Sequence, residues 1–291
     1  MKMRTKINFI VLVILLFDCV LTSCSQEVPK SKEDIEREKR KGYTEMRVYI
    51  KDIEIDTESK ELIEDFKFDK EGNILINTKT HSQYKLIYKY NDINRPIEIT
   101  DYDSDDRKKQ HKTIKYNKNS IIFEAINEYY YNDDLFRKTI IKYDDKGNKI
   151  SELSYQDNKV TSEYNTTNKY NDKNQLVQTI TYLTKDSDLY IDTITAIIIY
   201  EYDKDGNTIL KKYKKGGLSI PYNKEKLVYV IATKYKYNDK GSVIEKIEYD
   251  EKCEPTGTWM YEYKYNEKEL IIEKATYQDG EPKYMLVYEY E

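Results

Sequence analysis

The chain has 291 residues, a net charge of −4 at pH 7, and 35% charged residues with both signs mixed along its length. A nucleic-acid-binding protein needs a basic face, so this composition argues against nucleic acid as a partner. Tyrosine is the outstanding component, with 31 residues against 6 phenylalanines and 1 tryptophan. This excess indicates that the phenol hydroxyl is selected as well as the ring, since tyrosine combines an apolar face with a polar tip.

The first 23 residues have the pattern of a targeting segment. Lys2, Arg4 and Lys6 form a positive stretch, and residues 9–17 are an unbroken apolar run. A bilayer-spanning helix needs about 20 apolar residues, so this run is too short to cross a membrane and is typical of a signal peptide. We therefore assign residues 1–23 to a lipoprotein signal peptide, outside the folded domain.

The tetrapeptide LTSC at residues 21–24 resembles the bacterial lipobox. That resemblance implies that Cys24 becomes the N-terminus and carries diacylglycerol and a further acyl chain of the palmitate type. It also implies a protein held by lipid on the cell membrane or outer membrane, with its domain outside the cytoplasm. The alternative is an ordinary cleaved signal peptide in which Cys24 occurs by chance. Once the signal peptide and its Cys19 are removed, Cys253 is the only cysteine besides Cys24. We interpret Cys253 as a small apolar filler.

Residues 24–42 read as the lipidated cysteine followed by a charged tether. Ser31 and Asp34 resemble a capping box, but Ile35 is the only apolar residue between Ser31 and Gly42. A helix there would have no apolar face to bury, so we expect a frayed helix or spacer.

From residue 43 to residue 291 the chain repeats one pattern, which reads as strand, tight turn, strand. YEYDKDGNTILKKY at 200–213 is the clearest copy, with apolar and charged residues alternating on both sides of the turn. Eight copies of the turn segment begin at Phe68, Tyr90, Tyr116, Tyr143, Tyr170, Tyr202, Tyr237 and Tyr265. The pattern predicts an all-β domain, a repetitive antiparallel hairpin meander of roughly 16 strands at two per unit, extended or curled.

Within a unit, alternation predicts two chemically different faces. Tyr261, Tyr263 and Tyr265 fall on one face of their strand, whereas Glu262 and Lys264 fall on the other. Stacked hairpins are expected to place tyrosine beside tyrosine on the first face and lysine beside glutamate on the second.

The turns are expected to need a residue with positive φ at one position. That position is expected at Gly147, Gly206, Gly241, Asn94, Asn119 and Asn174, with Glu269 in the last copy.

Longer connections at 183–197 and 214–232 explain the two longest intervals between copies. Insertions of this kind into a repeat array often carry binding.

YEYDKDGNTI at 200 and YKYNDKGSVI at 235 resemble the YD repeat of Rhs-type proteins, over most of residues 66–291. Segments 255–263 and 277–290 also look somewhat like MORN-type hairpins. The resemblance implies an antiparallel repetitive sheet. In Rhs proteins such a sheet curls around a toxin, and we do not expect that cargo role here.

The chain offers little for catalysis. His81 and His111 both lie in polar stretches, and no nucleophile elbow, H-E-x-x-H or phosphate-binding glycine loop occurs. Asp203, Asp205 and Asn207 have the spacing of a calcium loop, but turn chemistry explains them equally well. We therefore expect no enzyme activity, no metal site and no cofactor.

The candidate ligand-binding residues are Trp259, Tyr261 and Tyr263, whose rings are suited to stacking on a sugar. The alternative is that they cover the sheet. The leading hypothesis is a non-enzymatic, membrane-anchored envelope protein with a binding or scaffold role toward protein or glycan. The two other hypotheses are an immunity or accessory lipoprotein of an Rhs-like toxin system and an enzyme acting on envelope polysaccharide.

Overall fold

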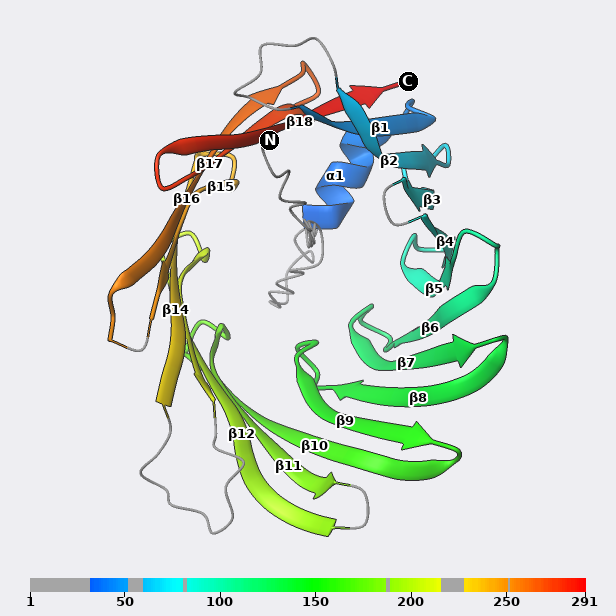
Figure 1. Ribbon diagram of the computed structural model, residues 1–291, viewed down its shortest axis with the longest axis vertical. Helices are drawn as coiled ribbons and strands as arrows, with labels where there is room; N and C mark the ends of the chain where they lie inside the picture. Colours follow the sequence, from blue (N-terminus) through cyan, green and yellow to red (C-terminus); the bar gives the residue numbers. More distant parts are fainter. Residues whose placement is uncertain (1–31, 52–59, 81–82, 187–188, 216–227, 251) are drawn as a thin grey trace, which may run out of the picture.

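The fold was obtained as a computed structural model, which describes residues 32–51, 60–80, 83–186, 189–215, 228–250 and 252–291. Within these residues one antiparallel sheet of 18 strands closes on itself, because β1 pairs with both β18 and β2 (Figure 1). The elements are α1 (Lys32–Arg40), β1 (Glu45–Lys51), β2 (Glu61–Phe68), β3 (Ile74–Lys79), β4 (Tyr84–Tyr90), β5 (Pro96–Tyr102), β6 (Lys108–Tyr116), β7 (Ile122–Tyr131), β8 (Asp134–Tyr143), β9 (Lys149–Gln156), β10 (Lys159–Tyr170), β11 (Leu176–Asp186), β12 (Leu189–Tyr202), β13 (Thr208–Lys215), β14 (Val228–Tyr237), β15 (Val243–Tyr249), β16 (Pro255–Tyr265), β17 (Ile271–Gln278) and β18 (Glu281–Tyr290).

The prediction of an all-β antiparallel hairpin array is confirmed, but the sheet is a closed barrel rather than an extended or curled meander. Two strands outside the eight repeat copies close it. The backbone amides of Thr44 and Glu45 donate to the carbonyl oxygen of Glu291 at 2.6 and 3.1 Å, and the amide of Glu291 donates to that of Glu45 at 3.0 Å. The two ends of the domain thus form a ninth hairpin without a covalent turn, and closure leaves no unpaired sheet edge.

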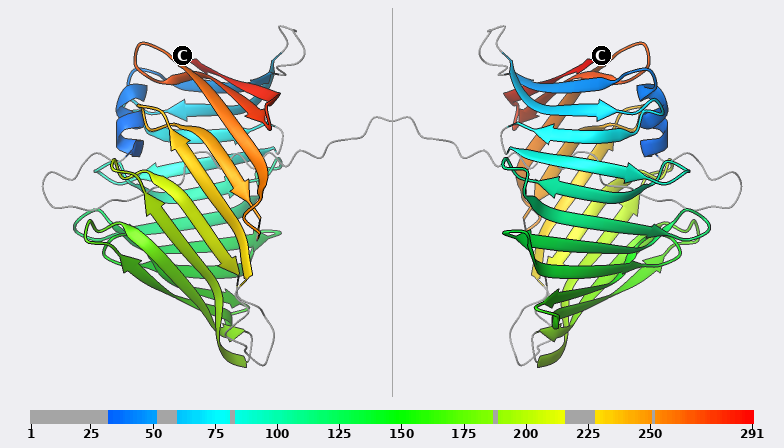
Figure 2. Two further views of the ribbon diagram at one scale, coloured as in Figure 1. Left: turned by 90° about the vertical axis from the view of Figure 1, so that its left-hand side faces the viewer. Right: turned by 90° about the vertical axis from the view of Figure 1, so that its right-hand side faces the viewer.

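Successive strands run in opposite directions, so their connections alternate between the two ends of the barrel. All eight repeat turns, from 69–73 to 266–270, therefore lie at one end, together with Glu291 and α1 (Figure 2). We call this end the turn mouth and the other the far mouth. The far mouth carries the connections between units, such as Asn132–Asp133 and Asp157–Asn158.

The repeat turns owe their Asp or Asn to hydrogen bonding with their own backbone. In the turn 203–207, the Asp203 Oδ1 atom accepts from the backbone amides of Asp205 at 2.9 Å and Asn207 at 2.8 Å. Asn171 makes the same pair of contacts in its turn, to Lys173 and Gln175. The side chain mimics a backbone turn and fixes the hairpin, which is why only Asp or Asn occurs there.

The expected positive-φ positions are largely confirmed. Gly147, Gly206, Gly241, Asn94, Asn174 and Glu269 all adopt positive φ, between 58° and 89°. Asn119 was the wrong residue in its turn, because Ser120 takes the left-handed conformation there with φ of 61°. The expected connection 183–197 is also wrong. Residues 183–186 belong to β11 and 189–197 to β12, so the longer interval comes from longer strands.

The register separates two faces, which we call lumenal and outer. The helix α1 lies inside the ring of strands (Figure 1), and its Arg40 guanidinium sits 5.4 Å above the ring of Phe68, which marks the face of Phe68 as lumenal. Residues paired directly across strands share a face. Tyr261 and Tyr263 are lumenal by this criterion, because they pair with Thr276 and Lys274, and these pair in turn with Tyr284 and Leu286.

The outer face carries the lysine–glutamate pairs that the sequence predicted. Four such pairs recur at matched positions of the repeat, with Nζ–Oε distances of 2.6 or 2.7 Å: Lys89–Glu98, Lys115–Glu124, Lys236–Glu245 and Lys264–Glu273. The expectation that tyrosines lie beside tyrosines is wrong across strands, because the register partners of Tyr261 and Tyr263 are Thr276 and Lys274. Tyrosines adjoin along one strand instead, as Tyr263 and Tyr265 do at 6.2 Å between ring centroids.

A hydrogen bond from tyrosine links each of several units to the unit before it. The phenol donates to the backbone carbonyl of the first residue of a strand in the preceding hairpin. These bonds, 2.7 to 3.1 Å long, are Tyr90 to Ile74, Tyr116 to Pro96, Tyr202 to Leu176, Tyr237 to Thr208 and Tyr290 to Ile271. The hydroxyl therefore has a structural use that phenylalanine cannot supply.

A buried hydrophobic cluster lies where the barrel closes. Met46, Val48, Phe66, Phe68 and Leu286 form a buried lumenal cluster on β1, β2 and β18. The partly buried rings of Tyr43, Tyr288 and Tyr290 pack against it. This cluster stabilises the seam between the two ends of the domain. In the part of the chain that the structure describes, no helix is long and apolar enough to span a bilayer.

Helix α1 is docked rather than free, which corrects the expectation of a spacer without a face to bury. Its buried face is polar. Asp34 forms two contacts of 3.2 and 3.1 Å with the Arg95 guanidinium, and Arg40, only 5% exposed, donates to the carbonyl oxygen of Gly72 at 3.1 Å. Salt bridges from Arg37 to Asp34 and from Arg40 to Glu33 complete the network. The helix thus ties two repeat turns to the start of the domain.

Candidate binding surfaces at the turn mouth and in the lumen

A groove opens at the turn mouth between the hairpins β12–β13 and β14–β15. The pairing of β13 with β14 ends toward this mouth at Leu210 and Lys234, so the two hairpins separate beyond that point. The space between them has a volume of about 570 Å³. We call it the mouth groove.

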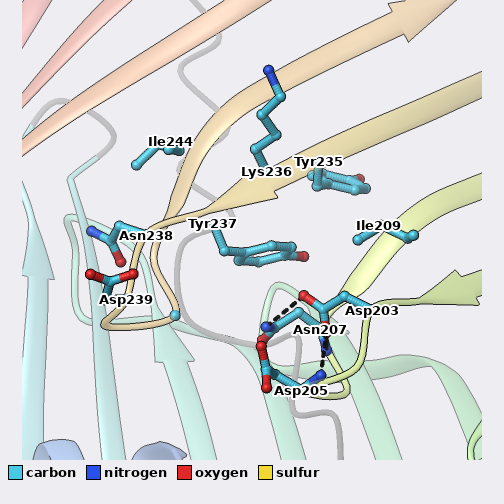
Figure 3. A pocket seen from close by; sticks show the side chains of 11 residues that line it. Asp203, Asp205, Asn207, Ile209, Tyr235, Lys236, Tyr237, Asn238, Asp239 and Ile244 are labelled. Atoms are coloured by element: carbon cyan, nitrogen blue, oxygen red, sulfur yellow. Dashed lines mark hydrogen bonds between the residues drawn. The ribbon is translucent and has the colours of Figure 1, made fainter.

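Aromatic rings and oxygen atoms line the mouth groove (Figure 3). Tyr235 and Tyr237 come from β14, and the turns on either side contribute Asp205 and Asp239. The Tyr237 hydroxyl donates to the carbonyl of Thr208 at 2.8 Å, so its ring spans the space between the two hairpins. Tyrosine rings offer apolar faces, and carboxylates at the rim accept hydrogen bonds from hydroxyl groups. This combination suits a saccharide.

Some turn carboxylates already accept hydrogen bonds from their own turn, and others are available to a ligand. Asp203 is engaged by its own turn, since its oxygens also accept from the Asn207 side-chain amide at 3.0 Å, and these bonds lower its pKa. In the described residues no group of three His, Cys, Asp or Glu side chains is arranged to hold a metal ion. The calcium-like spacing of Asp203, Asp205 and Asn207 is thus accounted for by turn formation.

The residues that the sequence predicted as ligand-binding share the lumenal face of β16. Trp259 is half-buried, and Lys246 of β15 pairs with both Trp259 and Tyr235, which places Trp259 two strands from the mouth groove. The Lys274 ammonium lies 4.5 Å from the centre of the Tyr261 ring and 5.9 Å from that of Tyr263. Their binding role stays a prediction, while the rings of Tyr235 and Tyr237 line an actual groove.

Lys274 is an unusual lysine. It is only 7% exposed, and among the described residues no carboxylate lies within 4.0 Å of its ammonium. Burial lowers its pKa to about 8, and burial raises the pKa of Tyr261 to about 12. The ammonium instead faces the rings of Tyr261 and Tyr263, an arrangement that stabilises a cation.

A second polar surface lies on the opposite lumenal wall, over β5 to β9. Lys112 pairs in register with Asn127, and Arg137 pairs with Tyr129. Asn127 is 9% exposed and its Oδ1 atom has no hydrogen-bond partner in the described structure.

Sequence reasoning missed both this lumenal surface and the mouth groove. The only signal for the groove was the 35-residue interval between the copies at Tyr202 and Tyr237, the longest in the chain.

The remaining candidates occupy ordinary positions or lie outside the described residues. His111 is on the outer face, with its Nδ1 atom 3.0 Å from the Thr100 hydroxyl and its Nε2 atom 3.4 Å from the Thr113 hydroxyl. Cys253 is exposed in the turn between β15 and β16, so its interpretation as an apolar filler is wrong. The signal peptide, Cys24 and His81 lie outside the described residues.

Comparison with known proteins gives matches in shape only. No protein-family model matches the chain, and a search of curated proteins also finds no match. Among solved structures, a porin-like protein from Bacteroides uniformis is 10% identical with a TM-score of 0.43, covering 86% of this chain and 96% of its own. A porin-like protein from Bacteroides vulgatus is 12% identical with a TM-score of 0.39, covering 86% and 98%.

A chain of the TcdB2-TccC3-Cdc42 structure is 12% identical with a TM-score of 0.37, and the match covers 77% of this chain but only 13% of that one. All these TM-scores are below 0.5, so the proposals below rest on the residues of this chain. The resemblance to YD repeats stays a prediction.

Proposed function

We propose that this chain is a non-enzymatic, lipid-anchored protein of the bacterial cell envelope that binds a saccharide in the mouth groove. The observation that carries the proposal is the groove itself, which is lined by the rings of Tyr235 and Tyr237 and by the turn carboxylates Asp205 and Asp239. A saccharide places its apolar ring face on an aromatic side chain and donates its hydroxyls to acceptors at the rim.

The charge of the rim narrows the ligand class. The carboxylates of Asp205 and Asp239 accept hydrogen bonds but repel anions. Among the described residues, the one lysine that lines the groove, Lys236, is already paired with Glu245 at 2.7 Å. A neutral saccharide or an amino sugar fits this rim better than an acidic one.

The outer face supports a barrel that stands in water. A barrel that crosses a membrane needs an apolar outer band about 25 Å tall. Here the outer face carries paired charges such as Lys89–Glu98 and Lys115–Glu124 in successive units. Attachment to the envelope is therefore assigned to lipid on Cys24, in the motif at residues 21–24. Several acyl chains hold such an anchor where a single chain gives only marginal binding.

The anchor is tested by expressing the full chain and a Cys24→Ser variant in a bacterium that processes lipoproteins. Mass spectrometry of the N-terminal peptide and partition into detergent are measured. We expect an acylated cysteine and detergent partition for the natural sequence only. An unmodified N-terminus after an A-x-A-like cleavage, with protein released from cells, would contradict the anchor.

The binding site is tested by screening the full chain, in detergent, on an array of neutral, amino and acidic saccharides. Asp239→Asn removes one rim carboxylate of the groove, and Asp172→Asn is the matched control, because both residues directly follow the first Asn of a repeat turn. We expect saturable binding of a neutral or amino saccharide that Asp239→Asn and Tyr235→Ala weaken at least tenfold and Asp172→Asn leaves unchanged.

Equal loss in Asp239→Asn and Asp172→Asn would show that the groove is not the site. Loss in Trp259→Ala alone would instead place the site on the lumenal face of β16, where the sequence predicted it.

A further inference from the structure

The lumenal wall formed by β5 to β9 carries a polar surface that the mouth groove does not use. The register aligns two rows across it, one containing Asp101, Gln110, Tyr129 and Arg137, the other containing Lys112, Asn127, Thr139 and Ser154. We call these residues the lumenal patch. Residues directly opposite in a sheet have Cβ atoms about 4.5–5.5 Å apart, so each row is a continuous strip of side chains.

The two cations of the lumenal patch lack counter-ions. Among the described residues no carboxylate lies within 4.0 Å of the ammonium of Lys112 or the guanidinium of Arg137, whereas Lys115, three residues along on the outer face, pairs with Glu124 at 2.7 Å. Arg137 contacts only uncharged groups, donating to the Ser154 hydroxyl at 3.2 Å with its guanidinium 5.7 Å from the Tyr129 ring. Burial lowers the pKa of Lys112.

The patch also holds oxygen atoms without donors. The Oδ1 atoms of Asn127 and Asp101 are buried, and no hydrogen bond to either is found in the described structure. Beneath them, the hydroxyls of Thr139 and Ser154 bond to each other at 3.2 Å and are almost fully buried, at 3% and 1% exposed. A buried oxygen without a donor costs free energy that a ligand hydroxyl would recover.

The two cations of the lumenal patch remain open to a ligand from the lumen. Arg137 is exposed and Lys112 is half-buried. A barrel of 16 to 18 strands is too wide for side chains to fill and leaves an aqueous interior. The cations are thus accessible above a floor of buried hydroxyl and amide groups.

We propose that the lumenal patch binds an anionic, hydroxyl-bearing ligand of the uronic-acid class. The carboxylate of the ligand pairs with Lys112 or Arg137, on the side of the patch away from the Asp101 carboxylate, and a ligand hydroxyl donates to the Asn127 Oδ1 atom. Strands β6 and β8 are two strand spacings apart, about 9–10 Å, so an oligomer reaches both cations at once. This site goes beyond the proposed saccharide groove, which lies between other hairpins and whose acidic rim disfavours such a ligand.

The test is isothermal titration of the full chain in detergent with trigalacturonic acid, and with maltotriose as the neutral probe. Lys112→Met removes one cation, Lys112→Arg restores the charge, and Lys115→Met removes a lysine from the opposite face of the same strand. We expect saturable binding of trigalacturonic acid that Lys112→Met weakens at least tenfold and Arg137→Met weakens likewise. The affinities of Lys112→Arg and Lys115→Met for trigalacturonic acid are expected to stay within twofold of that of the natural chain.

Absence of saturable trigalacturonic acid binding at low salt would overturn the assignment, and so would an equal loss in Lys112→Met and Lys115→Met. The unfolding midpoint of each variant is measured alongside, and Arg137→Lys serves as a second conservative variant should Lys112→Met fail to fold. Asp239→Asn separates the two sites. It is expected to impair neutral saccharide binding without changing the affinity for trigalacturonic acid, so failure of one site is read independently of the other.

Discussion

The Tyr202 hydroxyl donates a hydrogen bond of 2.7 Å to the backbone carbonyl oxygen of Leu176, the first residue of β11 in the preceding hairpin unit. The contact joins two units at the turn mouth, where β11 begins and β12 ends. Burial raises the pKa of the Tyr202 phenol, in agreement with a hydroxyl that keeps its proton for this bond. A repeat protein is stabilised by interactions within each unit and by interactions between neighbouring units. This hydrogen bond is an interaction between neighbouring units.

Replacing Tyr202 by Phe removes the hydroxyl and keeps the ring. The carbonyl of Leu176 then loses its donor, and we expect unfolding free energy to fall by about 0.5–1.5 kcal/mol, the net value of such a bond. Tyr90→Phe, which removes the corresponding bond to Ile74, is expected to behave in the same way. Urea denaturation followed by circular dichroism measures both effects.

Tyr84→Phe is the control. Tyr84 is 40% exposed, and no hydroxyl partner is found for it among the described contacts. We expect its unfolding free energy to stay within about 0.5 kcal/mol of that of the natural chain, as for most surface changes. Equal effects at positions 84, 90 and 202 would mean that the bonds between units contribute nothing measurable.

These bonds show where sequence reasoning succeeds and where it ends. The Asp or Asn that opens each turn was predictable, because the Asp203 side chain accepts hydrogen bonds from residues two and four positions along in the same turn. The tyrosine excess indicated a use for the hydroxyl. The acceptor could not be identified, because Leu176 lies 26 residues before Tyr202 and belongs to another unit.

Closure and helix docking were beyond sequence reasoning for a related reason. The ninth hairpin joins Thr44 to Glu291 without a turn, so no local signal marks it. Helix α1 buries Asp34 and Arg40 through ion pairs and a carbonyl contact, whereas a search for an amphipathic face looks only for apolar residues. The mouth groove arises where two hairpins separate, and only the length of one interval hinted at it.

Gly72 lies in a repeat turn directly against α1. A Cβ atom added there would lie 2.3 Å from the carbonyl oxygen of Arg37, a backbone atom that cannot move without moving the helix. Gly72→Ala is therefore expected to displace α1 from the turn mouth. We expect faster cleavage by trypsin at Arg37 and Arg40, together with a lower urea midpoint.

Gly241→Ala is the matched control, because both glycines have positive φ, 81° and 73°, and nothing lies within 4 Å of a Cβ at Gly241. In both variants, alanine must adopt the left-handed backbone conformation, which costs about 1–2 kcal/mol. Only Gly72→Ala adds the collision with the helix. If the two variants show the same midpoint and the same cleavage rate, α1 is not held by this contact.

Lys274 gives the protein an unusual dependence on pH. Its folded pKa is about 8 against an ordinary value of 10.5, because burial disfavours the ammonium. Between these values the unfolded chain binds more protons than the folded one, so stability rises with pH from about 8 upward. Below pH 8 the full penalty applies, on the order of 3 kcal/mol for a shift of this size.

Lys274→Met removes the charge and keeps an apolar chain of similar length. We expect the variant to be more stable at pH 7 by about 1–2 kcal/mol, since the lost contact with the Tyr261 ring offsets part of the gain. Its stability is expected to rise less steeply with pH between pH 7 and about 9.5, with the remaining slope coming from Lys112, whose pKa burial also lowers. Lys264→Met, on the outer face, is expected to keep the full rise of the natural chain. Urea midpoints are measured across this range, and an equally steep rise in Lys274→Met and the natural chain would assign the effect to another group.

Tyrosine ionisation acts in the opposite direction at higher pH. Burial raises the pKa of Tyr88 and Tyr261 to about 12, above the ordinary value of 10. The unfolded chain then loses protons first, so the stability that these groups confer is complete below pH 10 and is lost as pH rises from 10 toward 12. We expect cooperative alkaline unfolding in this range, in which the tyrosinate absorbance of the buried tyrosines rises together with the loss of circular dichroism. Tyr261→Phe should move this unfolding to higher pH. If instead the absorbance of all 31 tyrosines is complete while the circular dichroism is unchanged, the lumenal tyrosines are open to solvent rather than buried.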